Sequence, residues 1–72
     1  MQVKLELPAD TVRRIMEQAT DRRIEKNAIT LVRYFAEEDI RRLAEKADIA
    51  AQIRGLKTIQ ARDVTAARDL LS

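Results

Sequence analysis

The chain has 72 residues, the length of one small domain (residues 1–72), and it contains no Cys and no His. These absences exclude disulfides and thiolate metal sites, and they remove the commonest metal ligand and general base, so oligomerisation is the remaining way to support so small a core. Fourteen Lys and Arg against twelve Asp and Glu give a formal net charge of +2, a mildly basic balance that does not by itself indicate nucleic acid.

The N-terminal residues 1–7 alternate apolar and polar side chains over too short a run for a sheet, so we expect an arm there. Charged residues interrupt this start and no apolar run approaches ~20 residues, which predicts an intracellular protein without signal peptide or membrane span. Pro8 opens a first helix that is predicted to end at Ala19. Its apolar face consists of Val12, Ile15, Met16 and Ala19, and Arg13 and Arg14 lie beside that face.

Residues 20–26 form a charged connector whose only apolar side chain, Ile24, is expected to anchor it. A second helix should then run from Asn27, with Asn27 or a neighbour as its cap, to Arg54. This stretch has no Pro and no Gly, and Gly55 follows it, as is typical just past a helix end. At ~1.5 Å per residue it is ~42 Å long.

Apolar residues cover much of the circumference of this long helix, and helices of that kind are contacted from several sides. The short flanking segments cannot cover it, so we expect a partner subunit. The acidic run Glu37, Glu38 and Asp39 is expected to be solvated, and Arg41 and Arg42 are expected to form ion pairs at helical spacing. The apolar positions are Ala28, Ile29, Leu31, Val32, Phe35, Ala36, Ile40, Leu43, Ala44, Ala47, Ile49, Ala50 and Ala51.

A second connector, residues 55–59, precedes a last helix predicted from Gln60 to Leu71, and Thr58 is expected to accept backbone hydrogen bonds near its start. The inner face of this helix is predicted to carry Val64, Ala67, Leu70 and Leu71. The fold class is therefore all-α, with one long helix between two short ones.

This pattern resembles the histone fold, and most of all the minimal tailless histones of archaea and their bacterial relatives. The similarity extends from about Glu6 to Leu71 without a gap. It rests on Leu7-Pro8 with Arg14-Ile15, on Arg23-Ile24, and most specifically on Gly55, Lys57-Thr58-Ile59, Ala61 and Asp63-Val64.

The resemblance implies a head-to-tail dimer, here a homodimer, in which two long helices cross and the first connector of one subunit lies beside the second connector of the other. The implied dimer core is Leu31, Val32, Phe35, Leu43, Ala47, Ile24 and Ile59. The implied ligand is double-stranded DNA, held through phosphates without base readout. The implied DNA-binding residues are Arg13, Arg14, Arg22, Arg23, Lys57 and Thr58.

Within this set, the resemblance assigns Arg23 to the minor groove, with Arg22 as its substitute, and Arg14 and Lys57 to phosphates. Each residue also has a plainer interpretation. Arg13 and Arg14 would be solvated charges near Glu17, the connector arginines would serve solubility, and Lys57 and Thr58 would be loop charge and helix cap.

Two positions depart from the family pattern. Leu56 stands where many members have an Arg that pairs with the third-helix Asp, so Arg54 or Arg62 is expected to serve Asp63 instead. Ile53 stands where archaeal histones often have a His that joins one dimer to another. An apolar dimer–dimer contact is the alternative here, built from Ala50, Ile53, Asp63 and Ala66, or the protein stops at the dimer.

The leading prediction is an architectural DNA-binding protein, associated with the chromosome or nucleoid in the cytoplasm, that bends, wraps or compacts duplex DNA. The alternative is a histone-fold subunit that pairs with another protein in a transcription or chromosome-segregation complex. A third possibility is a helical homodimer without a ligand. We expect no enzyme, no cofactor, no metal and no small-molecule substrate, since neither a catalytic constellation nor a phosphate-binding loop is present.

Overall fold

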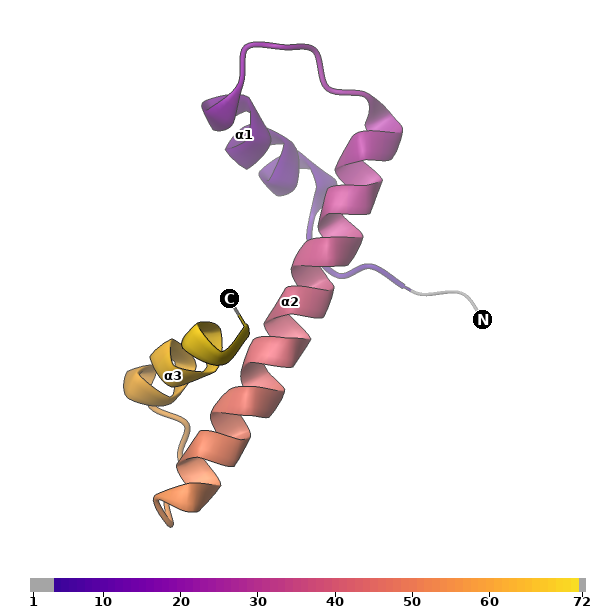
Figure 1. The fold of residues 1–72 in the computed structure, drawn as a ribbon. Helices are drawn as coiled ribbons and strands as arrows, with labels where there is room; N and C mark the ends of the chain where they lie inside the picture. Colours follow the sequence, from indigo (N-terminus) through magenta and orange to yellow (C-terminus); the bar gives the residue numbers. More distant parts are fainter. Residues whose placement is uncertain (1–3, 72) are drawn as a thin grey trace. The chain divides into compact units, whose positions relative to one another are not determined.

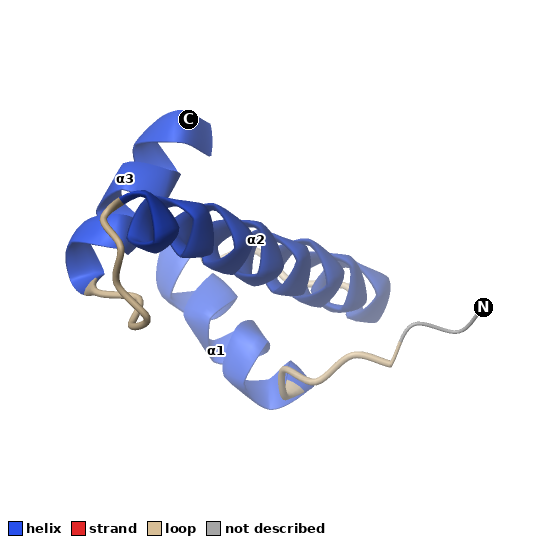
Figure 2. Cartoon of the chain, turned by 90° about the horizontal axis from the view of Figure 1, so that it is seen from below, coloured by secondary structure: helices blue, strands red, loops and turns tan. Residues whose placement is uncertain are grey.

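The computed structural model describes residues 4–71, with side chains to residue 70, and forms three helices connected by two loops (Figure 1). They are α1 (Ala9–Ala19), α2 (Lys26–Ile53) and α3 (Ala61–Leu71). No strand occurs within this range (Figure 2), so the prediction of a short, a long and a short helix is confirmed. The first three residues of the predicted arm lie outside the described residues. The chain divides into two compact units, residues 1–38 and 39–72, and the boundary falls within α2.

Helix α1 begins one residue later than predicted, at Ala9, and Pro8 is its N-cap in an extended conformation. The Pro8 carbonyl accepts the first helical hydrogen bond, from the Val12 N–H at 3.2 Å. No side chain caps this end of the helix, while Asp10 places a carboxylate in the first turn, where the helix dipole favours negative charge.

Helix α2 begins at Lys26, so Asn27 lies inside its first turn and is not its cap. The Glu25 carbonyl accepts the first bonds instead, from the N–H groups of Ala28 at 3.0 Å and Ile29 at 3.2 Å. The helix spans 28 residues as one continuous element, as its composition predicts.

The C-terminal end of α2 is closed by a pair of backbone hydrogen bonds around Gly55, which has φ 72°. The Gly55 N–H donates to the Gln52 carbonyl at 2.9 Å, and the Leu56 N–H donates to the Ala51 carbonyl at 3.0 Å. This is the Schellman arrangement, in which the residue after the glycine is commonly apolar. It gives Leu56 a local role at a position where the family pattern has Arg.

The core of the first unit is formed by Val12 of α1 and Ile29 of α2, which are buried. The predicted apolar face of α1 is only partly covered, because Met16 is half-buried while Ile15 is 59% exposed. Glu37 is buried too, which corrects the expectation that the whole acidic run is solvated.

The core of the second unit consists mainly of small side chains, with Ala47, Ala51 and Ala67 almost completely buried. The predicted inner face of α3 is only partly right. Ala67 is buried, but Leu70 is 76% exposed and Val64 is half-exposed. Asp63, one turn before Ala67, takes the inner position because its carboxylate binds Arg54. The side chain of Leu71 lies outside the described residues.

Candidate functional site

The connector between α1 and α2 presents two adjacent arginines, Arg22 and Arg23, both exposed. The Arg22 N–H donates to the Thr20 hydroxyl at 3.2 Å, which shapes the turn that leaves the helix. Among the residues that the structure describes, neither guanidinium has a hydrogen-bond or ion-pair partner. Both side chains are therefore available for an anion.

Arg13 and Arg14 belong to the same unit and lie on the exposed surface of α1. Their neighbour Val12 is the buried side chain of this helix, so the helical repeat directs the two arginines away from the core. The first unit thus carries four exposed arginines on α1 and the connector that follows it.

Lys57 and Thr58 are exposed in the second connector, which belongs to the second unit. Their meeting with the four arginines in a dimer stays a prediction. Thr58 does not cap α3, because the helix begins later, at Ala61. The carboxylate of Asp63 does this instead by accepting the Gln60 N–H at 2.8 Å, the reach-back half of a capping box.

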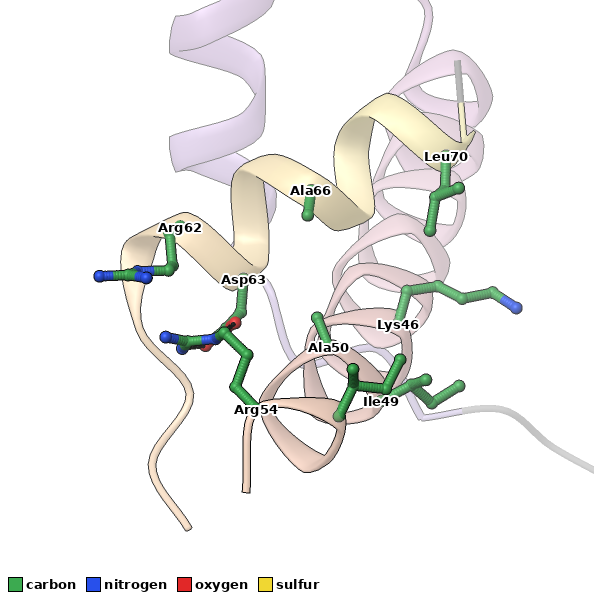
Figure 3. A pocket seen from close by; sticks show the side chains of 9 residues that line it. Lys46, Ile49, Ala50, Arg54, Arg62, Asp63, Ala66 and Leu70 are labelled. Carbon is green, nitrogen blue, oxygen red and sulfur yellow. Dashed lines mark hydrogen bonds and ion pairs between the residues drawn. The ribbon is translucent and has the colours of Figure 1, made fainter. Parts of the chain in front are cut away.

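Asp63 also accepts two hydrogen bonds from Arg54. Arg54 Nε donates to Oδ1 at 3.1 Å and Nη2 donates to Oδ2 at 2.8 Å, a bidentate pair in which Asp63 is 1% exposed (Figure 3). Of the two arginines expected to serve Asp63, it is Arg54 that pairs with it. Hydrogen bonds from Arg54 and from the Gln60 backbone lower the pKa of Asp63, and burial opposes them only in part.

An apolar hollow of about 450 Å³ lies beside this ion pair in the second unit (Figure 3). All four residues predicted for a contact between dimers line it, and three of them are apolar: Ala50, Ile53 and Ala66. The fourth, Asp63, also lines it, but its carboxylate is engaged within the chain. Sequence reasoning omitted other lining residues, Lys46, Ile49 and Leu70, although their spacing on α2 and α3 places them on the same faces.

The predicted dimer-core residues differ in how far their own chain covers them. Leu31 and Phe35 are more than half exposed, and Ile59 is 43% exposed. Ala47 is fully buried within the single chain, which leaves no surface for a partner to cover. The remaining predicted members are half-buried: Ile24, Val32 and Leu43.

Glu37 makes a tertiary polar contact that the sequence does not predict. Its Oε2 accepts hydrogen bonds from two consecutive backbone N–H groups, Glu6 at 2.7 Å and Leu7 at 2.8 Å. One turn earlier on α2, Arg33 Nε donates to the Leu7 carbonyl at 2.8 Å. The i, i+4 spacing of Arg33 and Glu37 shows that they share a helix face, but no local pattern indicates that residues 6 and 7 bind there.

Residues 4–71 contain neither a helix that could span a membrane nor a cluster of metal-binding side chains. No helix in this range combines the length and the apolar character that crossing a membrane requires. The same residues contain no cluster of three or more Asp, Glu, Cys or His side chains arranged to hold a metal ion.

Comparison with known proteins identifies a family and a relative of this chain. The family described as histone-like transcription factor (CBF/NF-Y) and archaeal histone matches residues 5–67. A DNA-binding protein named HmvA, from Methanocaldococcus jannaschii, is 43% identical over 58 residues. That similarity covers 81% of this chain and 60% of the relative, so the chain spans less than two thirds of the length of the relative.

Proposed function

This chain belongs to the family of histone-like transcription factors and archaeal histones, and on that premise we propose that it is an architectural protein that binds duplex DNA. One observation carries the proposal beyond family membership. Arg22 and Arg23 are adjacent and exposed, and within the described residues they have no partner. Arginines of this kind suit phosphate contacts and insertion into the minor groove.

The DNA-binding unit is a homodimer. Leu31 and Phe35 of α2 are more than half exposed in the single chain, and two long helices that cross would cover them. A dimer also brings the first connector of one subunit near the second connector of its partner, so that Lys57 and Thr58 join the arginines of the other chain.

The dimer binds through the DNA backbone and without sequence preference. Its formal charge is only +4, twice the +2 of one chain, so affinity depends on where the arginines lie and not on bulk charge. Arg23 enters the minor groove with Arg22 beside it, while Arg13, Arg14 and Lys57 contact phosphates. Such a protein bends or compacts DNA and is associated with the chromosome.

Dimers associate further through the apolar hollow of the second unit. Ile53 is 81% exposed and Leu70 is 76% exposed at this hollow, and a second dimer would remove them from water. Because this chain contains no His, the contact is apolar in this proposal, with Ala50 and Ala66 allowing close approach.

The test is binding of a duplex of mixed sequence across a series of salt concentrations. Removing one phosphate contact should flatten the slope of log K against log salt by about 0.9. We expect steep salt dependence for the wild type, and for Arg22→Ala/Arg23→Ala a shallower slope with weaker binding. The matched control is Arg41→Ala/Arg42→Ala, which removes the same charge from the middle of α2.

Equal losses in the two double variants would contradict the assignment of the connector arginines, because bulk charge would then explain the binding. If a folded wild-type dimer did not bind DNA at low salt, the proposed function would be wrong. A search for a second histone-fold protein as its partner would follow.

A further inference from the structure

Glu37 and Arg33 hold the backbone of the arm just before α1. The carboxylate of Glu37 binds the N–H groups of Glu6 and Leu7, and Arg33 binds the Leu7 carbonyl, all at 2.7 to 2.8 Å. We call these three hydrogen bonds the arm clasp. They connect positions 26 to 31 residues apart in the sequence, so they are tertiary contacts and not part of a local turn.

The clasp provides hydrogen-bond donors to a buried carboxylate. Glu37 is only 5% exposed, and a buried carboxylate is stable only where hydrogen bonds replace its water. Both N–H groups donate to the same carboxylate oxygen, Oε2, at short distances, so one side chain holds two consecutive backbone groups. Nothing in the DNA-binding proposal uses this buried carboxyl group.

The location of the clasp connects it to α1. Leu7 precedes Pro8, whose ring restricts the backbone and whose carbonyl accepts the first hydrogen bond of the helix. No side chain caps this end of α1. The other end of α1 leads into an exposed connector. There the Thr20 hydroxyl accepts a hydrogen bond from the Arg22 N–H. The clasp therefore fixes the N-terminal end of α1 against α2, two turns or less from Arg13 and Arg14.

We propose that Glu37 is a positioning residue for DNA binding, which acts through the arm to hold α1 so that Arg13 and Arg14 face the phosphates. This rests on the proposed function. It makes a prediction opposite in sign to simple electrostatics, because removing a negative charge from a DNA-binding protein ordinarily strengthens binding. Here, neutralising Glu37 should weaken it.

The experiment compares Glu37→Leu with Glu38→Leu. Both variants remove one carboxylate from adjacent positions of α2, but Glu38 is not part of the clasp. We expect Glu38→Leu to bind DNA as tightly as the wild type or slightly more tightly. Glu37→Leu should bind more weakly, and its salt slope should be shallower by about 0.9 for each phosphate that the dimer no longer reaches. Circular dichroism at the assay temperature verifies that each variant is folded.

A double-mutant cycle separates positioning from general stability. In an Arg13→Ala/Arg14→Ala background, Glu37→Leu should cause no further loss of affinity, because the side chains it positions are gone. If the loss persists in that background, or if Glu37→Leu binds like Glu38→Leu, the positioning role is overturned. Should Glu37→Leu fail to fold, Glu37→Gln replaces it. The amide oxygen of the new side chain can accept the same hydrogen bonds but carries no charge. We therefore expect its affinity for DNA to lie between those of the wild type and of Arg13→Ala/Arg14→Ala.

Hydrogen exchange of the free protein gives a readout that needs no DNA. The N–H groups of Glu6 and Leu7 should exchange slowly in the wild type and in Glu38→Leu, and rapidly in Glu37→Leu. Fast exchange in the wild type would overturn the clasp itself. Slow exchange in a wild-type dimer that does not bind DNA would refute the proposed function, and with it the positioning role, while leaving the clasp as a structural contact.

Discussion

Asp63 combines three tasks in one carboxylate at the start of α3. It pairs with both nitrogens of the Arg54 fork, accepts the Gln60 N–H, and places a negative charge in the first turn, where the helix dipole favours it. Because it is 1% exposed, it depends on these donors in place of water. A single side chain thereby connects the end of α2 to the beginning of α3.

The stability that Asp63 provides should depend on pH. Its pKa is lowered in the folded state, so the folded protein binds its proton less readily than the unfolded chain does. The contribution is therefore fully present above the ordinary aspartate pKa of about 3.9 and is lost as the pH falls through the lower, folded-state pKa. Asp63→Asn should unfold at lower urea concentration than the wild type at about pH 7.

As the pH falls below about 3.9, that difference in unfolding midpoint should shrink, because the wild type loses the ionised form as well. Asp39→Asn is the matched control, since Asp39 is exposed and the same substitution there should have little effect at either pH. A difference between Asp63→Asn and wild type that did not change with pH would show that the charge of Asp63 is unimportant.

The second connector is the element that two helix ends hold in place. Gly55 and Leu56 close α2 through the Schellman hydrogen bonds, and Asp63 caps α3 through Gln60. Only a few residues lie between these two closures, so Lys57 and Thr58 are presented on a short, restrained segment. Leu56 contributes its backbone N–H to the closure, and the ion pair with Asp63 draws its arginine from position 54.

Gly55 should be the most sensitive position of this connector to a small substitution. Its φ of 72° is the left-handed conformation, and a Cβ built there meets no atom within 4 Å, so backbone strain alone sets the cost. Gly55→Ala should lower the free energy of unfolding by about 1–2 kcal/mol in urea denaturation. Gly55→Asn should lose less, because Asn tolerates this conformation better. Equal stability of Gly55→Ala and wild type would show that α2 can end in another way.

At the scale of the whole molecule, the described residues of the single chain bury few apolar side chains. The described residues that are apolar and buried are Val12, Ile29, Ala47, Ala51 and Ala67, three of which are alanines. Large apolar side chains remain exposed along the chain, including Leu31, Phe35, Ile40 and Ile53. In the dimer that we propose, a second copy would cover such side chains and so stabilise this 72-residue chain.

Stability should therefore depend on protein concentration. The melting temperature of a dimer that unfolds to separate chains rises with protein concentration. We expect this rise in circular dichroism melts over a roughly hundredfold dilution series. Phe35→Asp, in the proposed dimer core, should abolish the folded dimer. Ile53→Asp, in the apolar hollow, should retain it and lose only larger assemblies, as sedimentation would show. A melting temperature independent of concentration would exclude the dimer as the folded unit.

Much of the fold could be predicted because it depends on local rules. The long helix follows from a stretch of strong helix formers without Pro or Gly, and Gly55 marks its end. The errors at helix starts have local causes too. Pro8 suits both a cap and a first turn, and Asn27 is a good cap residue that lies one position inside the helix.

The sequence predicts the positions of the candidate site residues better than their partners. The exposure of Arg13, Arg14, Arg22 and Arg23 follows from helix periodicity and loop position, and the structure places all four on the surface. The sequence offers two arginines, Arg54 and Arg62, as the ion-pair partner of Asp63. The three-dimensional arrangement shows that Arg54 is the one that pairs with it. The roles of these residues toward DNA stay predictions.

The sequence by itself determined the helices, the family and the exposed arginines, because these depend on propensity, periodicity and motif spacing within a few residues. Only the tertiary structure decided that Glu37 is buried under the arm and that Leu70, on the predicted inner face of α3, stays 76% exposed. The physical reason is the same in both cases. Whether a charged or apolar side chain meets solvent depends on atoms that are distant in sequence, and a helical repeat specifies a face without specifying what will cover it.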